Sequence, residues 1–135
     1  MRHILWALVA GFFVIGLRCS YAVEIRLTHI KGDVRVARAP DFKLQMAKEN
    51  MLLQIGDEVH TGFASSAHIV FDNGSEIVLK SLTQIKVQEY EKLKSLYKTI
   101  IDLRLGEIEA EVSSEFKSDF RVRTPNSTTS VKGTQ

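Results

Sequence analysis

The sequence predicts an all-β protein, and three observations support this expectation. Apolar and polar residues alternate with period two over most of the chain after Ala22. Glycine-containing turns separate the alternating segments, and only one short stretch has helical spacing. Period two places successive side chains on opposite faces of a strand. We therefore expect antiparallel strands in a twisted two-sheet sandwich or a rolled sheet, with a β-solenoid-like stack as the alternative.

Residues 1–22 are predicted to be a signal peptide that is cleaved after Ala22. A basic start is followed by an uncharged apolar run over residues 4–17 and by small residues at the two positions a signal peptidase reads. An uncleaved inner-membrane anchor is the alternative, although a span needs about 20 apolar residues. Lipidation of Cys19 is set aside because Arg18 precedes it. We expect an exported protein, either periplasmic or secreted.

The remaining chain, residues 23–135, has the length of a single domain. Of the 18 Lys and Arg residues, Arg2 and Arg18 lie in the leader, which leaves 16 basic against 16 acidic residues. A neutral chain without basic clusters predicts no nucleic-acid partner, and it predicts a membrane association only if the leader is retained. The only cysteine also lies in the leader, so the core has to hold the fold without disulfides.

The first alternating segments are residues 23–28 and 34–38, which are predicted to form strands on either side of a turn at Lys31-Gly32-Asp33. Pro40 and Asp41 end the second segment. Residues 42–50 have no clear period, and no structure is assigned to them.

Residues 67–80, AHIVFDNGSEIVLK, are predicted to form a hairpin. A two-residue turn would mix apolar and charged side chains on both faces. A three-residue loop over Asp72-Asn73-Gly74, with Gly74 in the left-handed conformation, instead places Ile69 opposite Ile77. One face then carries only apolar or small side chains: Ala67, Ile69, Phe71, Ile77 and Leu79.

Later alternating segments occur around residues 85–88, 101–105, 107–112 and 120–123. The apolar phase slips by one residue across Gly106, which predicts a bulge or a corner there. The basic pair in the last segment, Arg121 and Arg123, is expected to pair across strands with the acidic row Glu107, Glu109 and Glu111.

Residues 90–97, YEKLKSLY, interrupt the alternation because Tyr90, Leu93 and Tyr97 have helical spacing. Both a short amphipathic helix and the tip of a long hairpin fit this pattern.

Three strands are predicted to begin with a glycine followed by an acid: Gly32-Asp33, Gly56-Asp57 and Gly106-Glu107. Glycine reaches backbone angles that other residues resist, and a neighbouring carboxylate accepts hydrogen bonds from backbone N–H groups. These pairs predict corners of the chain.

Five motifs follow one another along the chain: LQIGDEVHT (53–61), AHIVFDNGSEIVLKSLTQIKV (67–87), LRLGEI (103–108), FRVRTPN (120–126) and SVKGT (130–134). In their order and spacing, over residues 31–135, they resemble the FecR domain family. The positions that match its motifs, with an expected structural role, are Gly56, Asp57, Thr61, Phe71, Asp72, Gly74, Ser75, Leu79, Gly106, Thr124, Pro125, Gly133 and Thr134.

The resemblance implies an all-β domain on the outer side of a bacterial inner membrane. In that family a further strand normally follows the Gly-Thr pair, so the domain is expected to be incomplete at its C-terminus. Regulatory members also carry a cytoplasmic part that handles a sigma factor, and only three residues precede the apolar run here. The arrangement is closer to the exported members.

The sequence indicates no catalytic, cofactor or metal site. Of the histidines after the leader, His60 and His68 flank a loop, but no cysteine or acidic cluster completes a zinc site, so surface positions are expected. Residues 72–75, DNGS, offer too few oxygens for calcium, and a tight turn is expected. No nucleophile elbow or phosphate-binding glycine loop is present in the sequence.

We therefore expect a non-catalytic, exported cell-envelope module that binds a protein or peptidoglycan through a sheet face or edge. One alternative, implied by the resemblance, is the periplasmic sensor part of an iron-uptake signal-transduction system of the anti-sigma-regulator type. The other alternative is a fragment without function. The sequence predicts no cofactor and does not indicate an oligomeric state.

Overall fold

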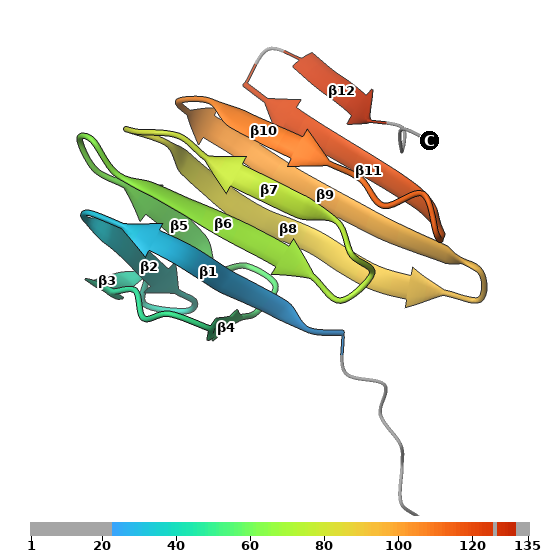
Figure 1. The fold of residues 1–135 in the computed structure, drawn as a ribbon, viewed down its shortest axis with the longest axis horizontal. Coiled ribbons are helices and arrows are strands. Elements are labelled where there is room, and N and C mark those ends of the chain that lie inside the picture. The colour runs from blue at the N-terminus through green and yellow to red at the C-terminus, as the bar shows by residue number, and fades with distance from the viewer. Residues whose placement is uncertain (1–22, 126, 132–135) are drawn as a thin grey trace, which may run out of the picture.

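The protein consists of two β-sheets that lie face to face in the computed structural model, which describes residues 23–125 and 127–131 (Figure 1). The all-β expectation is confirmed, because the regular structure of these residues is entirely strand. No helix in this part of the chain is long and apolar enough to cross a membrane. The predicted leader lies outside the described residues.

The strands are β1 (Ile25–Lys31), β2 (Val34–Arg38), β3 (Lys43–Met46), β4 (Met51–Leu53), β5 (Glu58–Thr61), β6 (Ser66–Phe71), β7 (Glu76–Leu79), β8 (Gln84–Leu93), β9 (Leu96–Leu105), β10 (Ile108–Glu111), β11 (Lys117–Thr124) and β12 (Ser127–Val131).

The two sheets have five and seven strands, in the orders β10-β7-β6-β1-β4 and β12-β11-β9-β8-β5-β2-β3. Neighbouring strands are antiparallel except β9 and β11, which are parallel. This differs from the purely antiparallel arrangement that the sequence predicted. The reason is that the chain leaves the seven-stranded sheet after β9, crosses to the other sheet as β10, and returns beside β9 in the same direction.

The core fills the space between the two sheets. Period two gives each strand one apolar face, and burying these faces against each other removes them from water. The largest fully buried side chains come from both sheets: Phe71, Phe120, Leu27, Ile69, Ile77, Leu79, Ile85, Ile101, Val34, Val36, Val59 and Val87. The two phenylalanines of this set, Phe71 and Phe120, meet edge to face, with their ring centroids 6.3 Å apart.

The first predicted turn carries the chain from one sheet to the other. Gly32 has a φ of +76°, and the two predicted strands on either side of it are present as β1 and β2. They do not pair with each other, because β1 lies between β6 and β4 whereas β2 lies between β5 and β3. Part of the unassigned segment 42–50 forms β3, at the edge of the seven-stranded sheet.

The predicted hairpin over residues 67–80 is confirmed with its register. Ile69 lies opposite Ile77, and the amide of Gly74 donates to the carbonyl of Phe71 over 3.0 Å. Gly74 has a φ of +88°, as the three-residue loop requires. The DNGS segment is therefore a tight turn, in which the amide of Ser75 donates to Asn73 Oδ1 over 2.9 Å.

The phase slip at Gly106 marks a corner between the sheets. Gly106 has a φ of +92°, and it separates β9 of the seven-stranded sheet from β10 of the five-stranded sheet. The apolar phase changes there because the core lies on the other side of the chain once the strand joins the opposite sheet.

Of the two structures considered for residues 90–97, the long hairpin is present and the helix is not. β8 and β9 pair as antiparallel strands through this segment.

The expected pairing between the basic pair Arg121 and Arg123 and the acidic row 107–111 is wrong. β11 and β10 belong to different sheets, so these side chains do not lie across from each other. Arg121 Nε instead lies 3.0 Å from Asp119, and Arg123 Nε lies 2.9 Å from Asp102. Alternation alone gives the face of each side chain but not the sheet to which its strand belongs.

Candidate functional site

The motif glycines and acids within the described residues lie at turns rather than around a cleft. Gly56 has a φ of +93° in the turn before β5. The neighbouring Asp57 is buried, and its Oδ2 accepts a hydrogen bond from the amide of Gln54 over 2.8 Å. Arg38 Nε approaches the same carboxylate at 3.9 Å. This pair thus stabilises a chain reversal, in agreement with the corner expected from the sequence.

A second buried polar centre joins the two sheets near Gly106. Thr61 Oγ1 donates to the carbonyl of Lys80 over 2.6 Å and accepts from the amide of Thr83 over 2.9 Å. Thr83 Oγ1 accepts from the amide of Glu107 over 3.1 Å and lies 3.0 Å from its carbonyl. Both threonines are buried. These hydroxyls satisfy backbone groups at a corner where strand pairing ends.

The turn of the β6–β7 hairpin is tied to β8 through a tyrosine. The phenol of Tyr90 donates to the carboxylate of Asp72, and the ring packs 4.8 Å from that of Phe71 between centroids. Burial, and then the negative charge and hydrogen bond of Asp72, raise the pKa of Tyr90 well above its ordinary value. The hydroxyl therefore remains a donor throughout the physiological range. Ser75 Oγ accepts from the amide of Ser113 over 3.1 Å and ties the same turn to the segment after β10.

The other motif positions that the structure describes also lack the features of a chemical site. Leu79 is a core residue, and Pro125 lines an open depression beside Asp102 and Arg123. Gly133 and Thr134 lie outside the described residues. Thr124 ends β11. The motif side chains that the structure describes thus lie mainly in the core or at turns, so the surface that meets a partner has to be sought elsewhere.

The edge strand β3 has an exposed apolar surface. It pairs with β2 on one side and is the last strand of its sheet. Leu44 and Met46 are 50% and 60% exposed, and Phe42, just before the strand, is 42% exposed. The register places Leu44 and Met46 on the outer face of the sheet. Their partners Ala37 and Arg35 alternate along β2 with Val34 and Val36, whose side chains belong to the core between the sheets.

Many of the other side chains on that outer face are charged. The register aligns one row across neighbouring strands, with Glu58, Lys86, Asp102 and Arg123 in adjacent positions. Arg104 Nη1 lies 2.7 Å from Glu58, and Arg123 Nε lies 2.9 Å from Asp102. The alternating signs neutralise one another, so the apolar surface at β3 is bounded by charges that already have partners.

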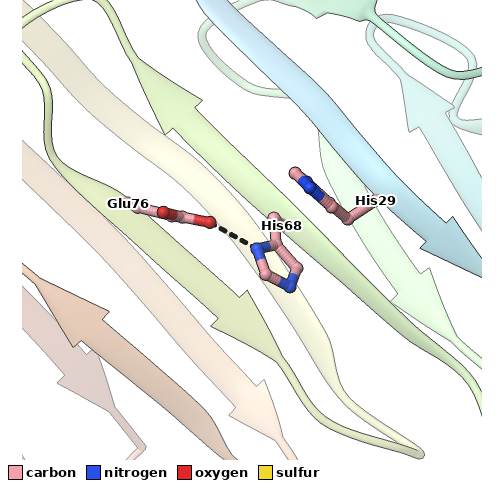
Figure 2. Close-up of side chains that lie close together, drawn as sticks. All are labelled: His29, His68 and Glu76. Carbon is pink, nitrogen blue, oxygen red and sulfur yellow. Dashed lines mark hydrogen bonds and ion pairs between the residues drawn. The ribbon is translucent and has the colours of Figure 1, made fainter.

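Two histidines and a glutamate meet on the outer face of the five-stranded sheet (Figure 2). The rings of His29 and His68 lie 4.6 Å apart between centroids, and His68 Nδ1 is hydrogen-bonded to a carboxylate oxygen of Glu76. The structure does not bring His60 to His68, although these two histidines flank one loop in the sequence. His60 lies in the other sheet, 3.3 Å from Glu58.

Sequence reasoning missed this cluster because His29 breaks the alternation of β1. The preceding residue, Thr28, lies opposite His68, so an ideal strand would turn His29 to the other face. The register of β1 shifts between Thr28 and Lys31, and His29 has a φ of +49°. This bulge turns the imidazole to the outer face, and no local pattern in the sequence signals it.

The comparisons with known proteins agree with the motifs. A family model with the description FecR protein matches residues 57–135, which is more than half of the chain. The residues from 31 to 56 that the motif resemblance also included lie outside this match. Neither the curated proteins nor the solved structures gave a match.

Proposed function

Because the chain belongs to the FecR family, which is regulatory and non-catalytic, we propose that it is a non-catalytic module of the cell envelope that recognises a protein partner. Export to the periplasm through residues 1–22 is part of this proposal. It rests on the basic start, the apolar run and the small residues that end the segment.

The observation that carries the proposal is the free edge of β3. An edge strand presents unpaired backbone N–H and C=O groups, to which an extended segment of another protein adds as a further strand. Proteins usually protect such edges with charges, prolines or very short strands. The edge strand β3 is short, with four residues, and begins with Lys43, but Leu44 and Met46 remain exposed on it. These two side chains supply apolar contacts for alternate side chains of an added segment.

A partner that is an extended protein segment fits this edge better than a wall polymer. Backbone pairing requires peptide groups, whereas a glycan is held mainly by hydrogen bonds from polar side chains and by aromatic stacking. The exposed apolar side chains at the edge are Phe42, Leu44 and Met46, and they outnumber the exposed polar ones of β3, Lys43 and Gln45. The only aromatic ring among them, Phe42, already has the cation of Lys86 5.5 Å from its centroid. The role in iron-uptake signalling that the family suggests remains a prediction, with an envelope protein as the expected partner.

Site-specific photo-crosslinking tests the proposal in intact cells. A photoreactive residue at position 44 is compared with one at position 105, because Leu105 is also exposed but lies on the interior strand β9. We expect a discrete protein adduct from position 44 and none from position 105. A second comparison places the photoreactive residue at position 46, with and without Leu44→Lys. The adduct from position 46 should be lost in the Leu44→Lys variant, since a lysine on the edge opposes strand addition.

Two results would contradict the proposal. Equal adducts from positions 44 and 105 would mean that β3 is not the recognition surface. Sedimentation of the purified protein with peptidoglycan, unchanged by Leu44→Lys, would instead support the wall-binding alternative. Circular dichroism of each variant shows whether the fold is retained.

A further inference from the structure

The cluster on the five-stranded sheet has the composition of a transition-metal site. His29, His68 and Glu76 each offer one ligand atom, and these atoms lie within 4.8 Å of one another. Two imidazoles and one carboxylate are ligands of Zn²⁺ and of neighbouring divalent metals such as Co²⁺ and Ni²⁺. We propose that this face binds one divalent transition-metal ion through His29, His68 and Glu76.

Three adjacent strands hold the ligands in place. His29 lies on β1, His68 on β6 and Glu76 on β7, and these strands are neighbours in the sheet. His68 faces Val78 across the β6–β7 pair, so Glu76 is its diagonal neighbour on the same face. Figure 2 shows both rings and the carboxylate side by side above this face. The ligands therefore come from a sheet rather than from a mobile loop.

The required movement is small. Zinc binds nitrogen and oxygen at about 2.0–2.2 Å, so two ligand atoms of a tetrahedral site are about 3.3 Å apart. The present separations of up to 4.8 Å require closure by about 1.5 Å, which side-chain rotation supplies because His29 is exposed and the other two are only partly buried. Three protein ligands leave the remaining position to water.

The bulge that presents His29 is itself held by a carboxylate. Glu49 accepts hydrogen bonds from the amide of His29 over 2.7 Å and from the amide of Ile30 over 3.1 Å. A non-glycine residue with positive φ is uncommon and costs free energy, so it persists only where its surroundings impose it. The two bonds to Glu49 impose it here, and the imidazole faces His68 as a result.

The ring of His29 also has an orienting partner of the kind that metal-bound histidines have. Its Nδ1 lies 3.0 Å from the hydroxyl of Thr28, which leaves Nε2 for a ligand. Metal-binding histidines usually donate their second ring N–H to an oxygen, and this fixes the tautomer. The Thr28 hydroxyl accepts such a proton when Nε2 binds the ion.

The surrounding charge favours a cation. Glu111 lies opposite Glu76 in the β7–β10 pair, and both line a shallow depression together with His68. Glu49 adds a third carboxylate beside the histidines. Two basic groups on the same face, Arg26 and Lys80, are already paired, since Arg26 Nη2 lies 3.1 Å from Glu24 and Lys80 Nζ lies 3.3 Å from Glu109. The carboxylates thus exceed the basic groups around the cluster.

Zinc and cobalt titrations test the proposal on the purified, tag-free chain after chelator treatment. We expect calorimetry to give one Zn²⁺ per chain, and we expect Co²⁺ to give a visible spectrum that Zn²⁺ displaces. His68→Gln should weaken binding at least as much as the loss of an outer-shell partner, about 10–100-fold. His60→Gln is the matched control, because His60 also lies beside a glutamate, Glu58, but belongs to no group of three potential ligands among the described residues.

The control separates this site from any binding by His3 or Cys19 in a retained leader, since both variants keep those residues. A second ligand variant, Glu76→Gln, covers the case in which His68→Gln does not fold. Absence of stoichiometric binding, or equal weakening by His60→Gln and His68→Gln, would overturn the proposal. The outcome is independent of the edge strand β3, which belongs to the other sheet.

Discussion

Replacement of Gly106 by alanine is expected to disrupt the corner that joins the two sheets. A Cβ at this position would lie 2.4 Å from Thr83 Oγ1, 2.5 Å from Thr83 Cα and 2.7 Å from the carbonyl oxygen of Leu82. Two of these atoms belong to the backbone, so rotating a side chain does not relieve the overlap. The same Thr83 hydroxyl also bonds the backbone of Glu107 at this corner.

The magnitude follows from two contributions. A non-glycine residue with φ near +90° is strained by about 1–2 kcal/mol. Crowding that forces the surrounding structure to move adds about 1–3 kcal/mol. Gly106→Ala should therefore lower the free energy of unfolding by about 2–5 kcal/mol, a large part of the 5–15 kcal/mol typical of a domain.

Gly56→Ala is the matched control. Gly56 has nearly the same φ, +93° against +92°, but its added Cβ would meet only the Ala39 Cβ at 4.0 Å. Only the backbone strain of about 1–2 kcal/mol applies to it. Urea unfolding followed by circular dichroism measures both variants. Equal losses for the two variants would refute the assignment of steric crowding to the Gly106 corner.

Three further predictions concern polar contacts of the fold. Tyr90→Phe leaves the Asp72 carboxylate without its phenol donor and should lower the free energy of unfolding in urea by about 1–3 kcal/mol. Because the pKa of Tyr90 is raised in the folded protein, the native protein should lose this stability as the pH rises above about 10. An alkaline melting profile that is identical in the variant would contradict this expectation. Thr61→Val removes the buried hydroxyl that accepts from the amide of Thr83, and we expect a loss of about 1–3 kcal/mol, whereas Thr61→Ser should retain most of the stability. The backbone amides at the β1 bulge lower the pKa of Glu49, so the stability that its carboxylate contributes is present above pH 4.5 and is lost as the pH falls below that value. Glu49→Gln should flatten the dependence of the melting temperature on pH in this acid range. An unchanged dependence would exclude the contribution.

The hairpin over residues 67–80 shows how far sequence reasoning reached. Its register, its three-residue loop and the left-handed Gly74 all followed from placing apolar side chains on one face, and the structure confirms each. The long hairpin of β8 and β9 was only one of two options, because Tyr90, Leu93 and Tyr97 match helical spacing as well. The tyrosines instead share the buried inner face, with ring centroids 6.2 Å apart.

The candidate sites were less accessible to sequence reasoning. The exposed edge at β3 lies in a segment without a clear period, and its position at the end of a sheet depends on pairing with β2. The cluster of His29, His68 and Glu76 depends on a bulge that is held by Glu49, a residue twenty positions away from His29. No spacing rule connects residues that meet only through such non-local contacts.

The sequence by itself determined the strands with clear alternation, their buried faces and the corners at Gly32, Gly56 and Gly106, because alternation and backbone freedom are local properties. The motifs likewise determined the family. Only the tertiary structure decided which sheet each strand joins, that β9 and β11 run parallel, and that Arg123 meets Asp102 instead of the acidic row. Those outcomes depend on contacts between distant strands, and two strands with the same alternation can occupy either sheet until the whole core is packed.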